Sequence, residues 1–233
     1  MKDTSSIPVE KLLPGSVLVA IATPDMWEHP VKPAEESAIL SSVDKRKREY
    51  RAGRHCASKV LSQLGVENFP LLNDQQRAPI WPTSIVGSLT HCDNFCCVVA
   101  TNKPDIISLG IDAEPLAALP NETTALICHN SELLSLQTTG LTEGYWRKVI
   151  FSAKEAFYKA YFPLCRQYLD FLEAKVKIQP GKTSSQKFIT HGEFVIQLLT
   201  PPHPALYNQQ SFSGRYLITH SHILTAITLF KPS

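Results

Sequence analysis

The sequence predicts an α+β protein made of two related subdomains. Two long segments have the apolar spacing of helices, at residues 44–64 and 145–162. Each is followed by runs rich in Val, Ile, Phe and Thr, which are typical of strands. Because this order of elements occurs twice, although no sequence repeat is visible, we expect a division near residue 110, into residues 1–110 and 111–233.

In the first half, the helix at 44–64 is expected to be capped by Ser42 or Asp44 and ended by Gly65. The Pro-rich stretch "RAPIWPTS" predicts a loop. The run "VGSLTHCDNFCCVVAT" predicts the first strand of a pair, "NKPD" a turn, and "IISLGIDAEP" the second strand, which ends at Pro115.

In the second half, residues 120–137 are predicted to be helical and 138–144 to be a loop. The strongest helical pattern follows, from Tyr145 to about Phe162. Strands are expected near the following residues: 172–179, 186–198 and 214–230, with the final two segments joined at "THSH".

The composition is that of a globular protein, with 43% hydrophobic and 19% charged residues among 233. No apolar run reaches the length of a membrane-spanning helix, and the N-terminus does not resemble a secretion signal. We therefore expect a cytoplasmic protein with reduced cysteines, and leave peripheral membrane association open. Zinc binding by His91, Cys92, Cys96 and Cys97 is conceivable, but their spacing fits no common zinc pattern.

The net charge of +2 is too small to indicate a polyanionic partner, but the basic residues are concentrated. Residues 44–64 contain seven Lys or Arg against two acidic residues. Arg51 and Arg54 lie there, and a guanidinium can donate two hydrogen bonds to one phosphate. The alternative for this segment is a solvated basic helix face.

Two carboxylates lie side by side in "GIDAEP". Successive strand residues point to opposite faces, so Asp112 and Glu114 share one face while Ile111 and Ala113 share the other. Neighbouring carboxylates repel unless a cation lies between them, and Mg²⁺ prefers such oxygen ligands. The alternative is two exposed carboxylates at the end of a strand.

A third carboxylate lies in the helix "FSAKEAFYKAYF". Its small and aromatic residues form the predicted buried stripe: Ala153, Ala156, Phe157 and Ala160. Glu155 and Lys159 share the opposite side, with Lys154 one step round the helix. The alanines predict close packing, which places the polar residues near a crevice; the alternative is an exposed Glu–Lys pair that contributes a few tenths of a kcal/mol. Thr90 and His91 begin a predicted strand, and a lone histidine there is usually structural.

Together, five motifs resemble those of one family. The stretches "EYRAGRHCA", "RAPIWP", "GSLTHC", "GIDAEP" and "FSAKEAFYKA" occur here in the order typical of Sfp-type 4'-phosphopantetheinyl transferases, most of all the enterobactin synthetase component D branch. The resemblance covers residues ~45–162, about half of the chain. It departs from the family at Thr90, where Ser is common, and at Arg77–Pro79, where Lys-Pro is usual.

The resemblance implies a monomer of two subdomains related by a pseudo-two-fold axis, with the active site in the cleft between them. Such enzymes use Mg²⁺ and move the phosphopantetheine arm of coenzyme A (CoA) to a serine of an apo acyl, peptidyl or aryl carrier protein, and they release adenosine 3',5'-bisphosphate. The carriers belong to siderophore, polyketide, fatty-acid or non-ribosomal peptide synthesis, and the sequence does not distinguish among these.

Carried over residue by residue, the resemblance implies that Asp112, Glu114 and Glu155 hold Mg²⁺. Glu155 and Lys159 would be catalytic, Glu155 taking the serine proton directly or through a metal-bound water. The positions implied to bind CoA are Arg51, Arg54, Arg77, Pro79, Thr90, His91, Asp112 and Lys154.

Two other functions were weighed. A metal-dependent nuclease also combines carboxylates with lysine, but typically has the later acid and lysine two apart on a strand, whereas Glu155 and Lys159 are four apart on a predicted helix. A nucleic-acid-binding module needs a wider basic surface and a known binding signature. We therefore expect no nucleic-acid partner.

Overall fold

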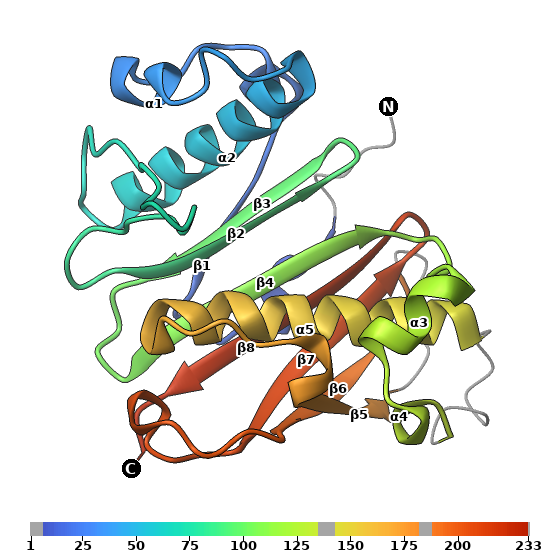
Figure 1. Ribbon diagram of the computed structural model, residues 1–233. Coiled ribbons are helices and arrows are strands. Elements are labelled where there is room, and N and C mark those ends of the chain that lie inside the picture. Colours follow the sequence, from blue (N-terminus) through green and yellow to red (C-terminus); the bar gives the residue numbers. More distant parts are fainter. Residues whose placement is uncertain (1–6, 135–142, 182–187, 233) are drawn as a thin grey trace.

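The computed structural model describes residues 7–134, 143–181 and 188–232, and places them in two antiparallel sheets with one long helix on each (Figure 1). The predicted α+β class is thereby confirmed. None of the described helices combines the length and apolarity that crossing a membrane requires.

The first sheet has the strand order β1-β3-β2. Its strands are β1 (Leu18–Ile21), β2 (Val86–Cys92) and β3 (Phe95–Thr101), and the helix α2 (Asp44–Gln63) packs on it. The apolar stripe of α2, which includes Cys56 and Val60, packs on the face of β3 that carries Cys96 and Val98. This burial holds α2 against the sheet.

The second sheet has the order β4-β8-β7-β6-β5. Its strands are β4 (Ile106–Pro115), β5 (Ala174–Pro180), β6 (Phe188–Leu198), β7 (Ser211–Thr219) and β8 (His222–Phe230). The helix α5 (Glu143–Cys165) lies along β4 and β8 (Figure 1). The short elements are η1 (Val9–Leu12), η2 (Pro24–Trp27), α1 (Pro33–Ser37), α3 (Asn121–Ile127), α4 (Asn130–Leu134), η3 (Phe171–Glu173) and η4 (Pro204–Leu206).

Both halves repeat one unit: a strand, a long helix, and a closing hairpin whose last strand pairs with the first. These pairs are β1 with β3 and β4 with β8. The sequence analysis missed the opening strand of the first half because β1 has only four residues. The division expected near residue 110 falls inside β4, so we propose a boundary between Thr101 and Ile106, which leaves both sheets whole.

Several predicted elements differ from those observed. Residues 86–101 are not one strand but the hairpin β2–β3, turning at Asp93 and Asn94, whose φ is 63°. The helix predicted over 120–137 is two short helices that break at Cys128; its last residues, and 138–142 of the predicted loop, lie outside the described residues.

Side chains join the two sheets where their edge strands meet. The N–H groups of Ile111 and Ala113 on β4 point away from β8, and hydroxyls of β2 accept their hydrogen bonds: Ser88 Oγ at 3.1 Å and Thr90 Oγ1 at 3.0 Å. These two hydroxyls, two residues apart on β2, thus replace the backbone carbonyl groups that would accept such hydrogen bonds within a sheet. They hold the halves together beside the cleft.

The close approach of α5 to β4 depends on Gly110. A Cβ at this position would overlap the backbone carbonyl oxygen of Ala156. The helix presents fully buried alanines here, Ala153, Ala156 and Ala160, as the sequence predicted, and Ser108 donates to the carbonyl oxygen of Ala160 at 2.8 Å. Small residues on both elements therefore set the distance between helix and strand.

Gly110→Ala should destabilise the protein by at least about 2 kcal/mol, because α5 must move away from β4 to admit the methyl group. Thermal unfolding should show a midpoint lower by roughly 4–8 °C for a chain of this size. Gly15→Ala is the matched control, since a Cβ there meets nothing within 4 Å. Equal melting of the two variants would contradict the proposed contact.

Candidate functional site

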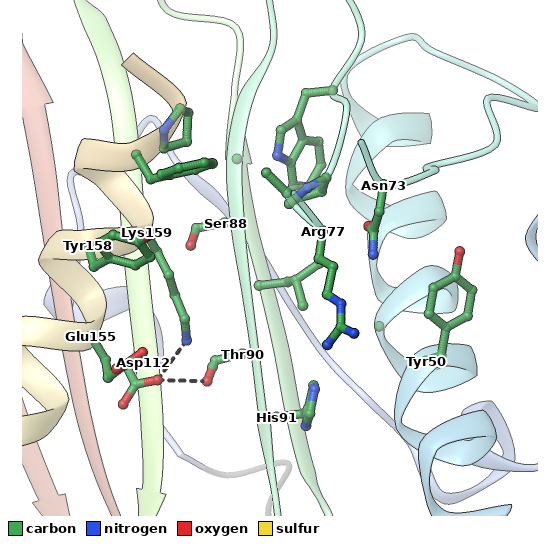
Figure 2. A pocket seen from close by; sticks show the side chains of 18 of the residues that line it. Tyr50, Asn73, Arg77, Ser88, Thr90, His91, Asp112, Glu155, Tyr158 and Lys159 are labelled. Atoms are coloured by element: carbon green, nitrogen blue, oxygen red, sulfur yellow. Dashed lines mark hydrogen bonds and ion pairs between the residues drawn. The ribbon is translucent and has the colours of Figure 1, made fainter. Parts of the chain in front are cut away.

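A cleft of about 410 Å³ lies between α2 and α5, with β2 running between them (Figure 2). On the side of the first half it is lined by Arg46, Glu49, Tyr50, Gly53, Arg54, Asn73, Gln76, Arg77, Ala78, Pro79 and Trp81. From β2, β4 and α5 come Gly87, Ser88, Leu89, Thr90, His91, Asp112, Glu155, Tyr158, Lys159, Phe162 and Pro163. Asp112, Glu155 and Lys159 line one wall, and the three arginines, with Glu49, line the other.

The polar face of α5 points toward β4. Lys148, Ser152, Glu155 and Lys159 follow the i, i+4, i+7, i+11 spacing of one helix stripe. On β4, Asp112 shares with the other even-numbered residues the face that α5 covers, as the strand alternation predicted. One helix face and one strand face therefore bring the acidic and basic groups together.

Asp112 is buried and held by three donors. Lys159 Nζ donates to Oδ1 at 2.6 Å, Ser152 Oγ donates to Oδ2 at 2.8 Å, and Thr90 Oγ1 approaches Oδ1 at 3.4 Å. Figure 2 shows Lys159 and Thr90 both reaching the same oxygen of this carboxylate. The carboxylate orientation is thus fixed by α5 and β2 together.

The other two carboxylates have raised pKa values. Burial raises the pKa of Glu114, the ion pair with Lys148 at 2.9 Å opposes that effect, and the charge of Asp112 adds to it. Burial also raises the pKa of Glu155, followed by the charge of Asp112. Asp112 and Glu155 line the cleft, whereas Glu114 lies outside it against Lys148.

As placed, these three carboxylates are not one metal cluster: no three His, Cys, Asp or Glu side chains among the described residues lie close enough to hold an ion. The donor set nevertheless fits a hard divalent cation, because all three groups are carboxylates and the charge of Asp112 raises the pKa of both Glu114 and Glu155. The four residues considered as zinc ligands in the sequence analysis cannot bind one ion, because Cys96 and Cys97 are buried on opposite faces of β3, in different hydrophobic cores.

On the first half, Arg54 is only 3% exposed and its guanidinium stacks on the ring of Tyr50, 3.9 Å from the centroid. It donates to Asn73 Oδ1 at 2.6 Å, and its Nε is buried without a hydrogen-bond partner in the described part of the chain. Burial lowers the pKa of Arg54. A buried cation with an unused donor fits a site for an anion.

His91 and Arg77 also lie where the sequence analysis expected them, along the cleft. His91 Nδ1 lies 3.7 Å from Glu49, and its Nε2 lies 3.3 Å from Arg46 Nη1. Burial lowers the pKa of His91, and the charge of Glu49 opposes this shift.

Arg77 has a left-handed backbone with φ of 67°. It lies in a loop whose Asp74 forms an ion pair with Arg166 at 2.5 Å. Pro79 follows in the same loop.

Two predicted CoA-binding residues lie elsewhere. Lys154 is buried and its Nζ contacts Glu132 at 3.1 Å and the carbonyl oxygens of Ile127 and Phe171 at 2.7 and 2.9 Å. Arg51 donates Nε to Glu36 at 2.9 Å, and this hydrogen bond raises the pKa of Arg51. Neither side chain lines the main cleft, although Lys154 lines a smaller cavity beside it, so a role of either residue in CoA binding stays a prediction.

The sequence analysis missed several residues of the site. Arg46 lies one turn before Tyr50 on α2, and its position in the basic run was the available signal. Ser152 and Lys148 lie on the same stripe of α5 as Glu155, and the helical period from Glu155 could have found them. Asn73 lies in a segment with no periodic pattern, so no signal pointed to it.

The chain was compared with known proteins. The family described as "4'-phosphopantetheinyl transferase N-terminal domain" matches residues 34–101, and the "4'-phosphopantetheinyl transferase superfamily" matches residues 108–219. The chain is 37% identical to the 4'-phosphopantetheinyl transferase Npt of Nocardia iowensis over 227 residues, which cover 94% of this chain and 98% of the relative. The chain belongs to the 4'-phosphopantetheinyl transferase superfamily.

Other relatives agree with this assignment. The transferase PptT of Mycobacterium tuberculosis is 34% identical over 95% of this chain and 97% of its own. Enterobactin synthase component D of Escherichia coli is 33% identical over 118 residues, which cover 50% of this chain and 55% of that protein. The predicted family is therefore confirmed, and the likeness to component D covers half of the chain. The two family matches meet at the boundary between the two sheets.

Lys154→Met should destabilise the protein by about 3–5 kcal/mol, because the buried carboxylate of Glu132 would lose its cationic partner, which lies 3.1 Å away. Urea denaturation would measure the loss, with Lys177→Met on exposed β5 as the control. A variant with wild-type stability that no longer bound CoA would instead support the predicted role of Lys154 in CoA binding.

Glu155→Gln should stabilise the metal-free protein at pH 7 but not near pH 4. The folded-state pKa of Glu155 lies above its ordinary value of 4.5, so ionisation opposes folding, and that cost grows as the pH rises from 4.5 through the raised pKa. Glutamine carries no such cost. Thermal unfolding in chelator at both pH values would measure the difference, and a pH-independent difference would refute the argument.

Proposed function

We propose that this transferase moves the 4'-phosphopantetheine arm of CoA to a serine of an apo carrier protein and releases adenosine 3',5'-bisphosphate. The supporting observation is the cleft itself, with Asp112, Glu155 and Lys159 on one wall and Arg54 and His91 on the other. A molecule with a pyrophosphate in its middle and a further phosphate at one end can contact both walls.

The nucleotide end of CoA would lie on the first half. The free Nε donor of Arg54 suits the 3'-phosphate, and Arg77 and His91 are close enough along the cleft to share its charge. Exclusion of water from Arg54 strengthens each such contact. We assign these residues to substrate binding.

Asp112 and Glu155, with Glu114, would hold Mg²⁺, which would neutralise pyrophosphate oxygens and polarise the phosphorus. Lys159, 2.6 Å from Asp112, is positioned to neutralise the charge that develops on the leaving phosphate. The magnesium requirement is part of this proposal.

The group transfer forms one bond and breaks one. The serine oxygen of the carrier attacks the phosphorus that bears the pantetheine arm, and the bond from this phosphorus to the oxygen of the departing adenosine bisphosphate breaks. Glu155 would accept the serine proton, and its raised pKa suits a base because it brings the group closer to neutral pH. The buried hydroxyl of Ser152 holds Asp112 in place meanwhile.

A smaller cavity of about 120 Å³ suits the pantetheine arm. Glu155 and Tyr158 line both this cavity and the main cleft, so the two adjoin. Its apolar walls include Leu169 and Phe171, which suit the methylenes of that arm, and Lys154 and Asp170 also line it.

The two rival functions find less support. Glu155 and Lys159 lie on the helix α5, not on one strand as typical nuclease sites have them. The basic face of α2 is partly neutralised, because Arg48 pairs with Glu28 and Arg51 with Glu36. A cytoplasmic monomer, and a carrier of siderophore or polyketide synthesis, stay predictions.

The purified protein should add one phosphopantetheine group to an apo carrier protein when CoA and Mg²⁺ are both present, as measured by intact-protein mass spectrometry. Lys159→Met should lose roughly 100-fold or more in rate because a fixed charge beside the leaving group is removed. Lys177→Met, whose side chain is exposed on β5, should transfer normally. Full transfer after chelation with EDTA would contradict the magnesium requirement but not the transferase activity. Failure to modify any carrier protein would contradict the activity itself.

A further inference from the structure

Lys148, which forms an ion pair beside the active site, has no part in the mechanism above. Lys148 Nζ lies 2.9 Å from Glu114 Oε2, and the two side chains are only 14% and 22% exposed. Lys148 comes from the polar stripe of α5, and Glu114 from the strand position two residues beyond Asp112. Because the pair is largely shielded from water, its attraction is stronger than that of a surface pair.

Each carboxylate of β4 has its own lysine from α5. Lys159 pairs with Asp112, and Lys148 pairs with Glu114. Glu155 lies between the two lysines along the helix, and its carboxylate has no ion pair or hydrogen bond within the described residues. Three carboxylates and two lysines leave the group with a single net negative charge.

A divalent cation that binds among these carboxylates must come close to Lys148. It either displaces the lysine from Glu114 or binds with the ammonium nearby, and both cost free energy: the first breaks a shielded ion pair, and the second places two cations together. Lys148 therefore opposes the cation, whichever carboxylates finally hold it.

We propose that Lys148 is the built-in counter-ion of Glu114 and that it weakens the binding of divalent cations when CoA is absent. The pyrophosphate of CoA adds the negative charge that the lysines have neutralised, so the cation binds together with CoA rather than before it. This inference rests on the proposed function, in which the carboxylates hold the metal. It makes Lys148 a residue that sets metal affinity and not a catalytic residue.

The test uses Mn²⁺ as the probe, since electron paramagnetic resonance reports the free ion directly. Metal-free protein is titrated with Mn²⁺, with and without CoA. Without CoA, Lys148→Met should bind Mn²⁺ about tenfold more tightly than wild type, which corresponds to about 1.4 kcal/mol. CoA should then strengthen Mn²⁺ binding less in the variant than in wild type, because the two ligands are coupled through the same charge.

Two control variants separate the charge of Lys148 from its position. Lys148→Arg keeps the charge and should bind Mn²⁺ within about twofold of wild type by the same electrostatic argument. Arg147→Met removes a charge one residue away, from a side chain that pairs with Glu143 and Asn121 instead, and should also have little effect. Lys148→Gln is a second neutral variant, which can still donate a hydrogen bond to Glu114 and so preserve the fold. It should bind Mn²⁺ as tightly as Lys148→Met does.

The outcomes are distinguishable. Unchanged or weaker Mn²⁺ binding in folded Lys148→Met and Lys148→Gln would overturn the inference while leaving the metal site in place. An equal gain in Arg147→Met would show a general charge effect and would also overturn it. A wild-type protein that binds no Mn²⁺ even with CoA would overturn the proposed metal site and this inference with it. Tighter binding in the two Lys148 variants alone would support the inference.

Discussion

The site depends on the contact between two strand edges that share no backbone ladder. Ser88 and Thr90 of β2 accept hydrogen bonds from the N–H groups of Ile111 and Ala113 on β4. Thr90 also faces Asp112, while its neighbour His91 points to the other side, toward α2 (Figure 2). A single stretch of β2 therefore fixes the distance between the carboxylate wall and the wall that we propose binds the nucleotide.

The second constraint is the close packing of α5 on β4. Gly110 and the buried alanines of the helix let the two backbones approach, so the polar stripe of α5 lies directly over the acidic residues of the strand. The short distances from Lys159 and Ser152 to Asp112 follow from that packing. The charges of the site are thus positioned by apolar contacts, which are not directional but leave little room for movement.

Much of this arrangement could be predicted from the sequence. The period of two along β4 placed Asp112 and Glu114 on one face, and the helical period of α5 placed Glu155 with Lys159. Lys154 points away from the main cleft because adjacent helix residues diverge by about 100°, and its pairing with Glu132 was not predictable because Glu132 lies in a short helix without a periodic signal. The β2–β3 hairpin was missed because its turn, Asp93–Asn94, lacks the glycine that usually marks such turns. That Glu114 faces Lys148 is a tertiary contact that no local pattern encodes.

The strand order of the second sheet has a consequence for how the protein folds. β4 ends at Pro115, but β8, the strand that pairs with it among the described residues, begins at His222. During synthesis β4 therefore stays unpaired on that edge until β8 has been made, and the sheet that carries its acidic residues is incomplete until then. Contacts of such high sequence separation slow folding because a long loop must close before they form. The first half can form its sheet without waiting, so we expect it to be ordered early and to offer the hydroxyls of β2 as a template on which β4 is held until β8 arrives.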